Sequence, residues 1–169
     1  TLIGAKVTPA FEDSTEISFL FRAKLTTHAS NTEFDCGYAD AAGTASNASH
    51  SFAMALACGT TPAADVVTCY LDDDNGDRSA EAVTLSAVAG LENWDPAQYF
   101  MFGGTLRQSG DKYVAKYFVD GVLIATIVDD VASPVAGHFD GQRMGLFATQ
   151  AAGTGLASID YAYAELPRS

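Results

Sequence analysis

Apolar and polar residues alternate with a period of two along most of this chain. In residues 17–25 every odd position is apolar, and most even positions are polar. Successive side chains of a β-strand point to opposite faces, so this pattern predicts a strand with one buried face. Similar runs recur to the end of the chain, and they predict strands over residues 17–25, 34–39, 51–58, 66–71, 82–88, 99–102, 105–108, 112–119, 122–128, 143–149 and 158–166.

The residues between these runs are typical of turns. Asp120-Gly121 separates two β-branched and aromatic runs, and this two-residue spacing is typical of a type I′ hairpin. Gly103-Gly104 interrupts an apolar run, which predicts a bulge or bend between two short strands. The best helical signal is a single turn over residues 93–98, in which Asp95 would cap the helix start.

These features predict an all-β fold. Short strands with turn residues every eight to twelve positions favour an antiparallel sandwich or barrel over alternating strands and helices. We expect a two-sheet antiparallel β-sandwich. The chain has 169 residues, 48% of them hydrophobic, and no Pro-rich linker divides it. We therefore expect one domain over residues 1–169.

Charge excludes two classes of partner. Nine Lys and Arg residues stand against 21 Asp and Glu residues, which gives a formal net charge of −12. Nucleic-acid binding uses clustered basic residues, and the sequence has no such cluster. An anionic membrane surface would repel the chain for the same reason. The chain shows no signal-peptide pattern and begins at Thr1 rather than Met, which suggests processing or a longer parent protein.

The three cysteines allow two interpretations. Cys58 and Cys69 lie near the two ends of a predicted hairpin loop, so they could form a bridge and leave Cys36 free. Alternatively, all three thiols are buried and behave as small hydrophobic residues. We favour the second interpretation because three cysteines are too few for a disulfide framework.

The sequence contains no recognisable catalytic pattern. A glycosidase needs two carboxyl groups across the bound sugar, and no predicted strand carries an alternating series of acidic residues. No G-x-S-x-G motif is present, and the spacing of the histidines and cysteines matches no zinc pattern. We therefore predict that the protein is not an enzyme.

The acidic turn over residues 72–77 is the one feature that indicates a metal ion. Calcium binds six to eight oxygen ligands, and this turn offers several carboxylates close together. The alternative is a solvated hairpin tip that keeps a sheet edge soluble. We expect no other cofactor. The candidate calcium ligands are Asp72, Asp74 and Asp77.

Short motifs across the chain resemble the concanavalin A-like and laminin G-like jelly-roll family. The segment 117–125, Y-F-V-D-G-V-L-I-A, is similar to a hairpin of that family. Residues 142–148 and 157–161 resemble its last two strands, and 17–25 resembles an early strand with a central arginine. The resemblance implies a two-sheet jelly roll, and it marks fold rather than activity.

Two non-catalytic branches of that family fit this chain. Residues 34–40 followed by 51–54 resemble a strand and loop found in tailed-phage virion proteins. The first hypothesis is a structural or surface protein of such a virion, in capsid decoration, fibre or tail, packed against neighbouring virion or self subunits. The second is a carbohydrate-binding or adhesion module of a bacterial secreted or surface protein. A glycan-active enzyme is third. The first two place the protein on a virion surface or outside the cell.

Aromatic residues are the candidate ligand contacts, because an exposed ring can stack on a sugar of a polysaccharide. A Trp or Tyr ring more often packs in the core, however, so each candidate has two interpretations. The candidate ligand-binding residues are the aromatic Tyr38, Trp94 and Tyr99, together with the acidic Asp40.

Overall fold

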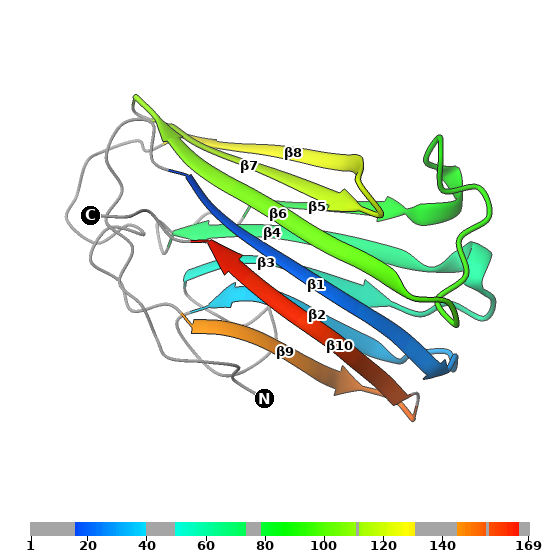
Figure 1. Cartoon of the computed structure of the whole chain (residues 1–169). Coiled ribbons are helices and arrows are strands. Elements are labelled where there is room, and N and C mark those ends of the chain that lie inside the picture. Colours follow the sequence, from blue (N-terminus) through cyan, green and yellow to red (C-terminus); the bar gives the residue numbers. More distant parts are fainter. Residues whose placement is uncertain are drawn as a thin grey trace.

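The protein folds as two antiparallel five-stranded sheets packed face to face (Figure 1). The computed structural model describes residues 16–39, 50–73, 79–110, 112–130, 145–154 and 156–165. The first sheet, here the front sheet, has the strand order β10-β1-β6-β7-β8, and the back sheet has the order β5-β4-β3-β2-β9. The predicted all-β sandwich is confirmed. The strands are β1 (Glu16–Thr27), β2 (Glu33–Ala39), β3 (His50–Ala57), β4 (Val66–Asp73), β5 (Ser79–Thr84), β6 (Phe100–Ser109), β7 (Lys112–Val119), β8 (Val122–Asp130), β9 (Gly145–Ala152) and β10 (Leu156–Glu165).

The core lies between the sheets and is rich in aromatic rings. The odd residues of β1, from Ile17 to Leu25, are buried as the alternation predicts. Phe19 on the front sheet meets Phe52 on the back sheet, with ring centroids 4.9 Å apart. Such pairs contribute roughly 0.5–1.5 kcal/mol beyond the burial of their apolar area. The two sheets are therefore held together by the side chains that the period-two pattern assigns to the inner face.

The predicted bend at Gly103-Gly104 is wrong, because β6 runs through both glycines without a break in register. Gly104 faces the core. A Cβ atom there would lie only 2.7 Å from ring atoms of both Phe19 and Phe52. Glycine is needed at this position for space, since the two rings occupy the volume of a side chain.

The predicted hairpin at residues 120–121 is confirmed between β7 and β8. Asp120 and Gly121 both have positive φ angles, 49° and 79°, as a type I′ turn requires. Asp120 also holds the beginning of β6: its Oδ1 accepts a 2.7 Å hydrogen bond from the backbone N–H of Met101. Its own backbone N–H donates to the carbonyl of Met101 at 2.9 Å. The hairpin tip is thereby fixed beside the loop that enters β6.

The segment after β5 and the loop before β6 differ from the prediction in kind. The strand predicted to reach residue 88 ends at Thr84, and a 3₁₀ turn, η2 (Leu85–Ala87), follows. The single helical turn expected over residues 93–98 is a non-helical turn, although Asp95 still caps it through a 3.0 Å bond from the N–H of Ala97. The other 3₁₀ turn is η1 (Pro62–Ala64). In the described part of the chain, no helix has the length and apolar character needed to cross a membrane.

All three cysteines are free and buried, so Cys58 and Cys69 do not form a bridge. The register explains this, because Cys69 lies opposite Met54 on β3, four residues before Cys58. The interpretation of the cysteines as small hydrophobic core residues is confirmed.

Candidate functional site

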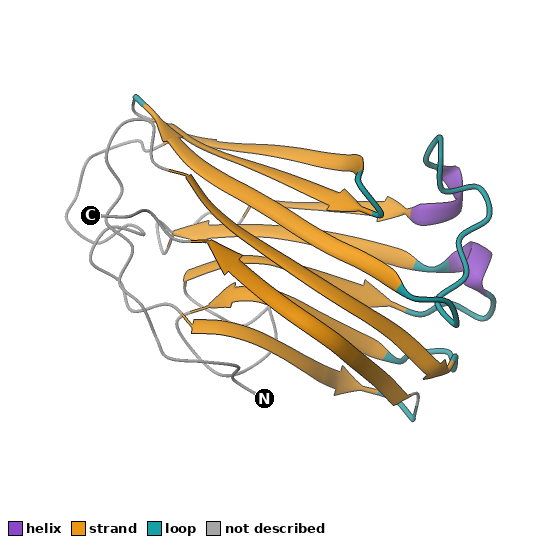
Figure 2. Cartoon of the chain, viewed as in Figure 1, coloured by secondary structure: helices purple, strands orange, loops and turns teal. Residues whose placement is uncertain are grey.

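The described loops gather mostly at one end of the sandwich, where both 3₁₀ turns lie (Figure 2). An open pocket of about 180 Å³ lies between the loop that joins η2 to β6 and the tip of the β7–β8 hairpin. Its polar lining includes two amides and two carboxylates, and its aromatic lining includes a Trp and a Tyr. These six residues are Asn93, Gln98, Asp95, Asp120, Trp94 and Tyr99.

Tyr99 joins this pocket to the outer face of the front sheet. Its ring is 42% exposed. The guanidinium carbon of Arg22 lies 4.1 Å from the ring centroid, and Nζ of Lys24 lies 4.9 Å from it. Arg22 also forms an ion pair with Asp160 on β10. Contacts of a cation with an aromatic ring are attractive, so the two basic side chains hold Tyr99 in place at the rim of the pocket.

The outer face of the front sheet carries all the basic residues that the structure describes. On β1, β6 and β7 these residues occupy the positions that alternate with the buried ones. Acidic residues on the same face are Glu16, Asp160 and Glu165. The described side chains of this face therefore carry a small excess of positive charge, although the whole chain is strongly acidic. The basic residues of this face are Arg22, Lys24, Arg107, Lys112 and Lys116.

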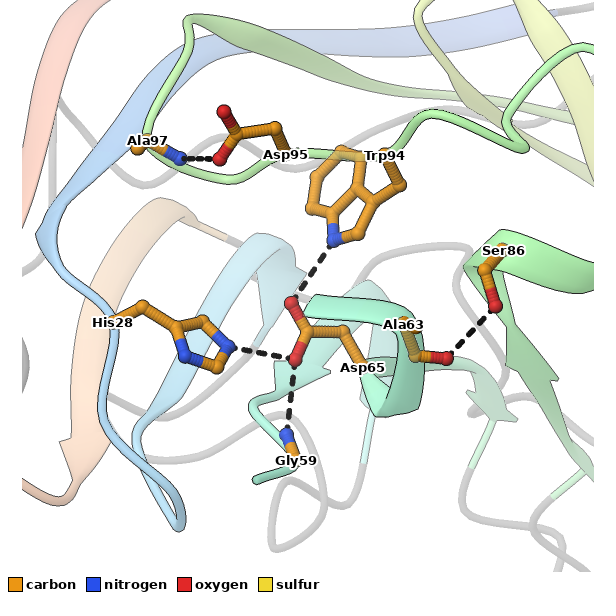
Figure 3. Close-up of polar contacts among 8 residues, drawn as sticks. All are labelled: His28, Gly59, Ala63, Asp65, Ser86, Trp94, Asp95 and Ala97. Atoms are coloured by element: carbon orange, nitrogen blue, oxygen red, sulfur yellow. Dashed lines mark hydrogen bonds and ion pairs between the residues drawn. The ribbon is translucent and has the colours of Figure 1, made fainter. Parts of the chain in front are cut away.

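Asp65 lies behind the pocket and is fully buried. Figure 3 shows three loops converging on its carboxylate. The indole N–H of Trp94 donates to Oδ2 at 2.9 Å, and the backbone N–H of Gly59 donates to Oδ1 at 2.9 Å. Nε2 of His28 lies 2.9 Å from the same Oδ1. A buried carboxylate needs such partners, so Asp65 fixes the loops that form this end of the sandwich.

Cys58 completes this group. One donor atom from each of His28, Cys58 and Asp65 lies within 4.8 Å of the others. Burial, with a smaller contribution from the Asp65 carboxylate, raises the pKa of the Cys58 thiol to about 12. Sequence reasoning missed this cluster, because its residues are 30 and 7 positions apart on loops whose proximity depends on the packing of the sheets.

The structure separates the predicted ligand-binding residues. Tyr38 is 1% exposed and stacks on Phe52, so its ring has no free face, and its assignment as a ligand contact is corrected to a core role. Burial raises its pKa to about 12. Trp94 is buried and packs against Phe100 with ring centroids 5.1 Å apart, although it also contributes to the lining of the pocket. Tyr99 is the predicted aromatic residue that is exposed. Asp40 lies outside the described residues.

The calcium prediction stays a prediction. Asp72 is buried in β4 opposite Ser51 on β3. Asp74 and Asp77 lie outside the described residues.

Comparison with known proteins gives structural likeness only. No family model matches the chain, and no curated protein matches its sequence. Among solved structures, sheep galectin-11 in complex with glycerol superposes with a TM-score of 0.52 at 12% identity, over 98% of this chain and 100% of that one. The binding domain of botulinum neurotoxin DC, in complex with rat synaptotagmin II, gives a TM-score of 0.53 at 11% identity.

A second neurotoxin structure, the receptor-binding domain of the botulinum C/D mosaic serotype, gives a TM-score of 0.50 at 12% identity. This chain covers 89% of its own length but only 32% of each of the two neurotoxin chains. At such low identity, these likenesses show a shared two-sheet sandwich fold.

Proposed function

We propose that this protein is a non-catalytic glycan-binding module and that the pocket beside Tyr99 binds the sugar. The observation that carries the proposal is an exposed aromatic ring at the rim of a pocket lined by amides and carboxylates. A sugar has apolar C–H faces that pack on aromatic rings and hydroxyls that exchange hydrogen bonds with such groups. One solved structure with this fold, sheep galectin-11, holds glycerol, which is a polyol.

The preferred ligand in this proposal is an acidic glycan. Arg22 and Lys24 lie over the Tyr99 ring, so a sugar that meets the remaining exposed part of that ring has two cationic groups beside it. Guanidinium and ammonium groups make strong charge-assisted hydrogen bonds to carboxylate and sulfate oxygens. The remaining basic residues of the front sheet extend the same face, whereas the rest of the described chain has none. A neutral glycan would gain nothing from these charges.

The carboxylates in the pocket have structural roles. Asp95 and Asp120 are both exposed, and each uses its Oδ1 to accept a hydrogen bond from a backbone N–H. A glycosidase acid is instead shielded from water, which keeps its proton in place at neutral pH. We therefore favour binding over hydrolysis. Incubation with the bound polysaccharide should release no new reducing ends, and steady release that stops in Asp120→Asn would overturn the proposal.

The setting that we propose is the surface of a tailed-phage-type virion, and the alternative is a bacterial secreted or surface protein. The support is the resemblance of residues 34–40 and 51–54 to virion domains. Native mass spectrometry separates the two settings. A closed symmetric assembly supports a virion subunit, and a monomer that binds polysaccharide supports the isolated module.

Affinity electrophoresis in gels that contain an acidic polysaccharide tests the binding site. The wild-type chain should be retarded, and Tyr99→Ala should migrate as it does without polysaccharide. Tyr163→Ala is the matched control, since Tyr163 is an exposed tyrosine on the same face but does not line the pocket. Retardation that Tyr99→Ala leaves unchanged would place the ligand elsewhere.

A further inference from the structure

We propose that His28, Cys58 and Asp65 form a binding site for a divalent transition-metal ion of the zinc type. His28 lies on the loop after β1, whereas Cys58 and Asp65 begin and end the loop between β3 and β4, so two loops supply the three donor atoms. These three atoms, an imidazole nitrogen, a thiol sulfur and a carboxylate oxygen, lie within 4.8 Å of one another. The site is distinct from the proposed glycan pocket, because none of the three residues lines that pocket.

The chemistry of the donor set selects the metal. Zinc accepts nitrogen, sulfur and oxygen ligands, whereas calcium and magnesium bind oxygen. With bonds of about 2.0–2.3 Å, donor atoms around tetrahedral zinc lie roughly 3.3–3.8 Å apart. Nε2 of His28 and Oδ1 of Asp65 are already 2.9 Å apart. Small side-chain rotations would therefore bring the three donors onto a common ion.

The surroundings of Asp65 favour this role. Its carboxylate is held by two further donors, the N–H of Gly59 on Oδ1 and the indole N–H of Trp94 on Oδ2. Hydrogen bonds of this kind orient metal-binding carboxylates in known sites. An ion would replace the direct contact between His28 and Asp65 and leave both of these bonds in place.

The site would keep one position open. Three protein ligands leave a tetrahedral ion with a fourth position, which a water molecule occupies in sites of this type. The side chain of His28 is 18% exposed, so solvent can reach the cluster from that side, while Asp65 is fully buried. The alternative is that Asp65 serves only as a hydrogen-bond acceptor that joins the loops. In that case, a metal ion would find no binding site in this cluster.

Cobalt substitution distinguishes these alternatives. Titrating the reduced 169-residue chain with Co²⁺ should produce a thiolate-to-cobalt charge-transfer band, and added Zn²⁺ should abolish it. Trp94 is the only tryptophan, so its fluorescence should fall in parallel as Co²⁺ binds beside Asp65. Cys58→Ser should remove the band, and His28→Ala should weaken Co²⁺ binding at least tenfold. Cys36→Ser is the matched control, since it alters a buried thiol outside the cluster and should keep the band.

Absence of the band in the wild-type chain would overturn the proposal, as would an unchanged band in Cys58→Ser. If Cys58→Ser fails to fold, alkylation of the wild-type chain provides the decisive measurement. Saturating Zn²⁺ should slow the modification of Cys58 at least tenfold, as followed by peptide mass spectrometry, and should slow that of the buried Cys36 by a smaller factor, through stabilisation of the fold alone. Equal rates with and without Zn²⁺ would also overturn the proposal.

Discussion

The indole N–H of Trp94 donates a 2.9 Å hydrogen bond to Oδ2 of Asp65, a carboxylate that is fully buried. The two residues are 29 positions apart, and their bond joins the loop before β6 to the loop before β4. Trp94 lines the candidate pocket, while its indole N–H is bonded to Asp65 inside the protein. The shape of the pocket therefore depends on a buried polar contact.

Replacing Asp65 should destabilise the fold strongly. Asp65→Ala removes the acceptor of Trp94 and Gly59, and buried donors without a partner cost about 1–3 kcal/mol each. We expect a loss of roughly 2–4 kcal/mol in the free energy of unfolding, measured by urea denaturation with Trp94 fluorescence as the probe. The exposed control Glu81→Ala should change it by less than about 0.5 kcal/mol. A similar small change in Asp65→Ala would contradict the role of this carboxylate.

Neighbouring glycines of β6 should respond differently to the same substitution. Gly104→Ala places a Cβ 2.7 Å from the Phe19 and Phe52 rings, so overpacking should cost about 1–3 kcal/mol. Gly103→Ala is the control, because its Cβ would meet Leu20 Cδ1 at 3.3 Å, on the outer face. Thermal unfolding of the two variants compares them directly. Equal melting temperatures of the two variants would mean that the core can accommodate a Cβ atom at Gly104 without a loss of stability.

Stability should fall at alkaline pH. Burial raises the pKa of Cys36 and Cys69 above the ordinary value of 9.0. Above pH 9 the unfolded chain loses these protons and the folded chain keeps them, so the free energy of unfolding decreases as pH rises. Urea denaturation at pH 7.5 and pH 10 measures this decrease. Cys36→Ala should show a smaller decrease than the wild-type chain, and an equal one would argue against a buried thiol as its source.

The basic side chains beside Tyr99 should control affinity for acidic glycans. The double variant Arg22→Ala/Lys24→Ala should bind an acidic polysaccharide about tenfold more weakly, which corresponds to roughly 1.4 kcal/mol. Its binding should also depend less on salt, since fewer ionic contacts remain. Lys112→Ala is the control, because Lys112 pairs with Ser109 at the opposite end of β6 from Tyr99. Equal losses in both variants would contradict a site centred on Tyr99.

The alternation of residue types predicted most of the fold. It placed β1, β7 and β8 within a few residues, because one face of each strand is buried and the other is exposed. It failed at Gly104, where the requirement for glycine comes from two rings that lie far away in sequence. Local pattern carries no information about which strand will lie opposite.

The candidate site was less predictable for the same reason. The basic residues of the front sheet are scattered along the sequence and come together through the pairing of β1, β6 and β7. Tyr38 and Tyr99 both lie in predicted strands, yet the structure buries Tyr38 and exposes Tyr99. Asp65 gave no signal, because a single acidic residue before an apolar strand is ordinary until its partners are known.

Equilibrium binding of the wild-type chain to a matched pair of polysaccharides, one acidic and one neutral, tests the proposed function most directly. Isothermal titration at low and high salt measures both affinities. The proposal predicts saturable binding of the acidic polymer that weakens as salt increases, and markedly weaker binding of the neutral one. Absence of binding to either polymer would contradict the assignment of the Tyr99 pocket as a glycan site.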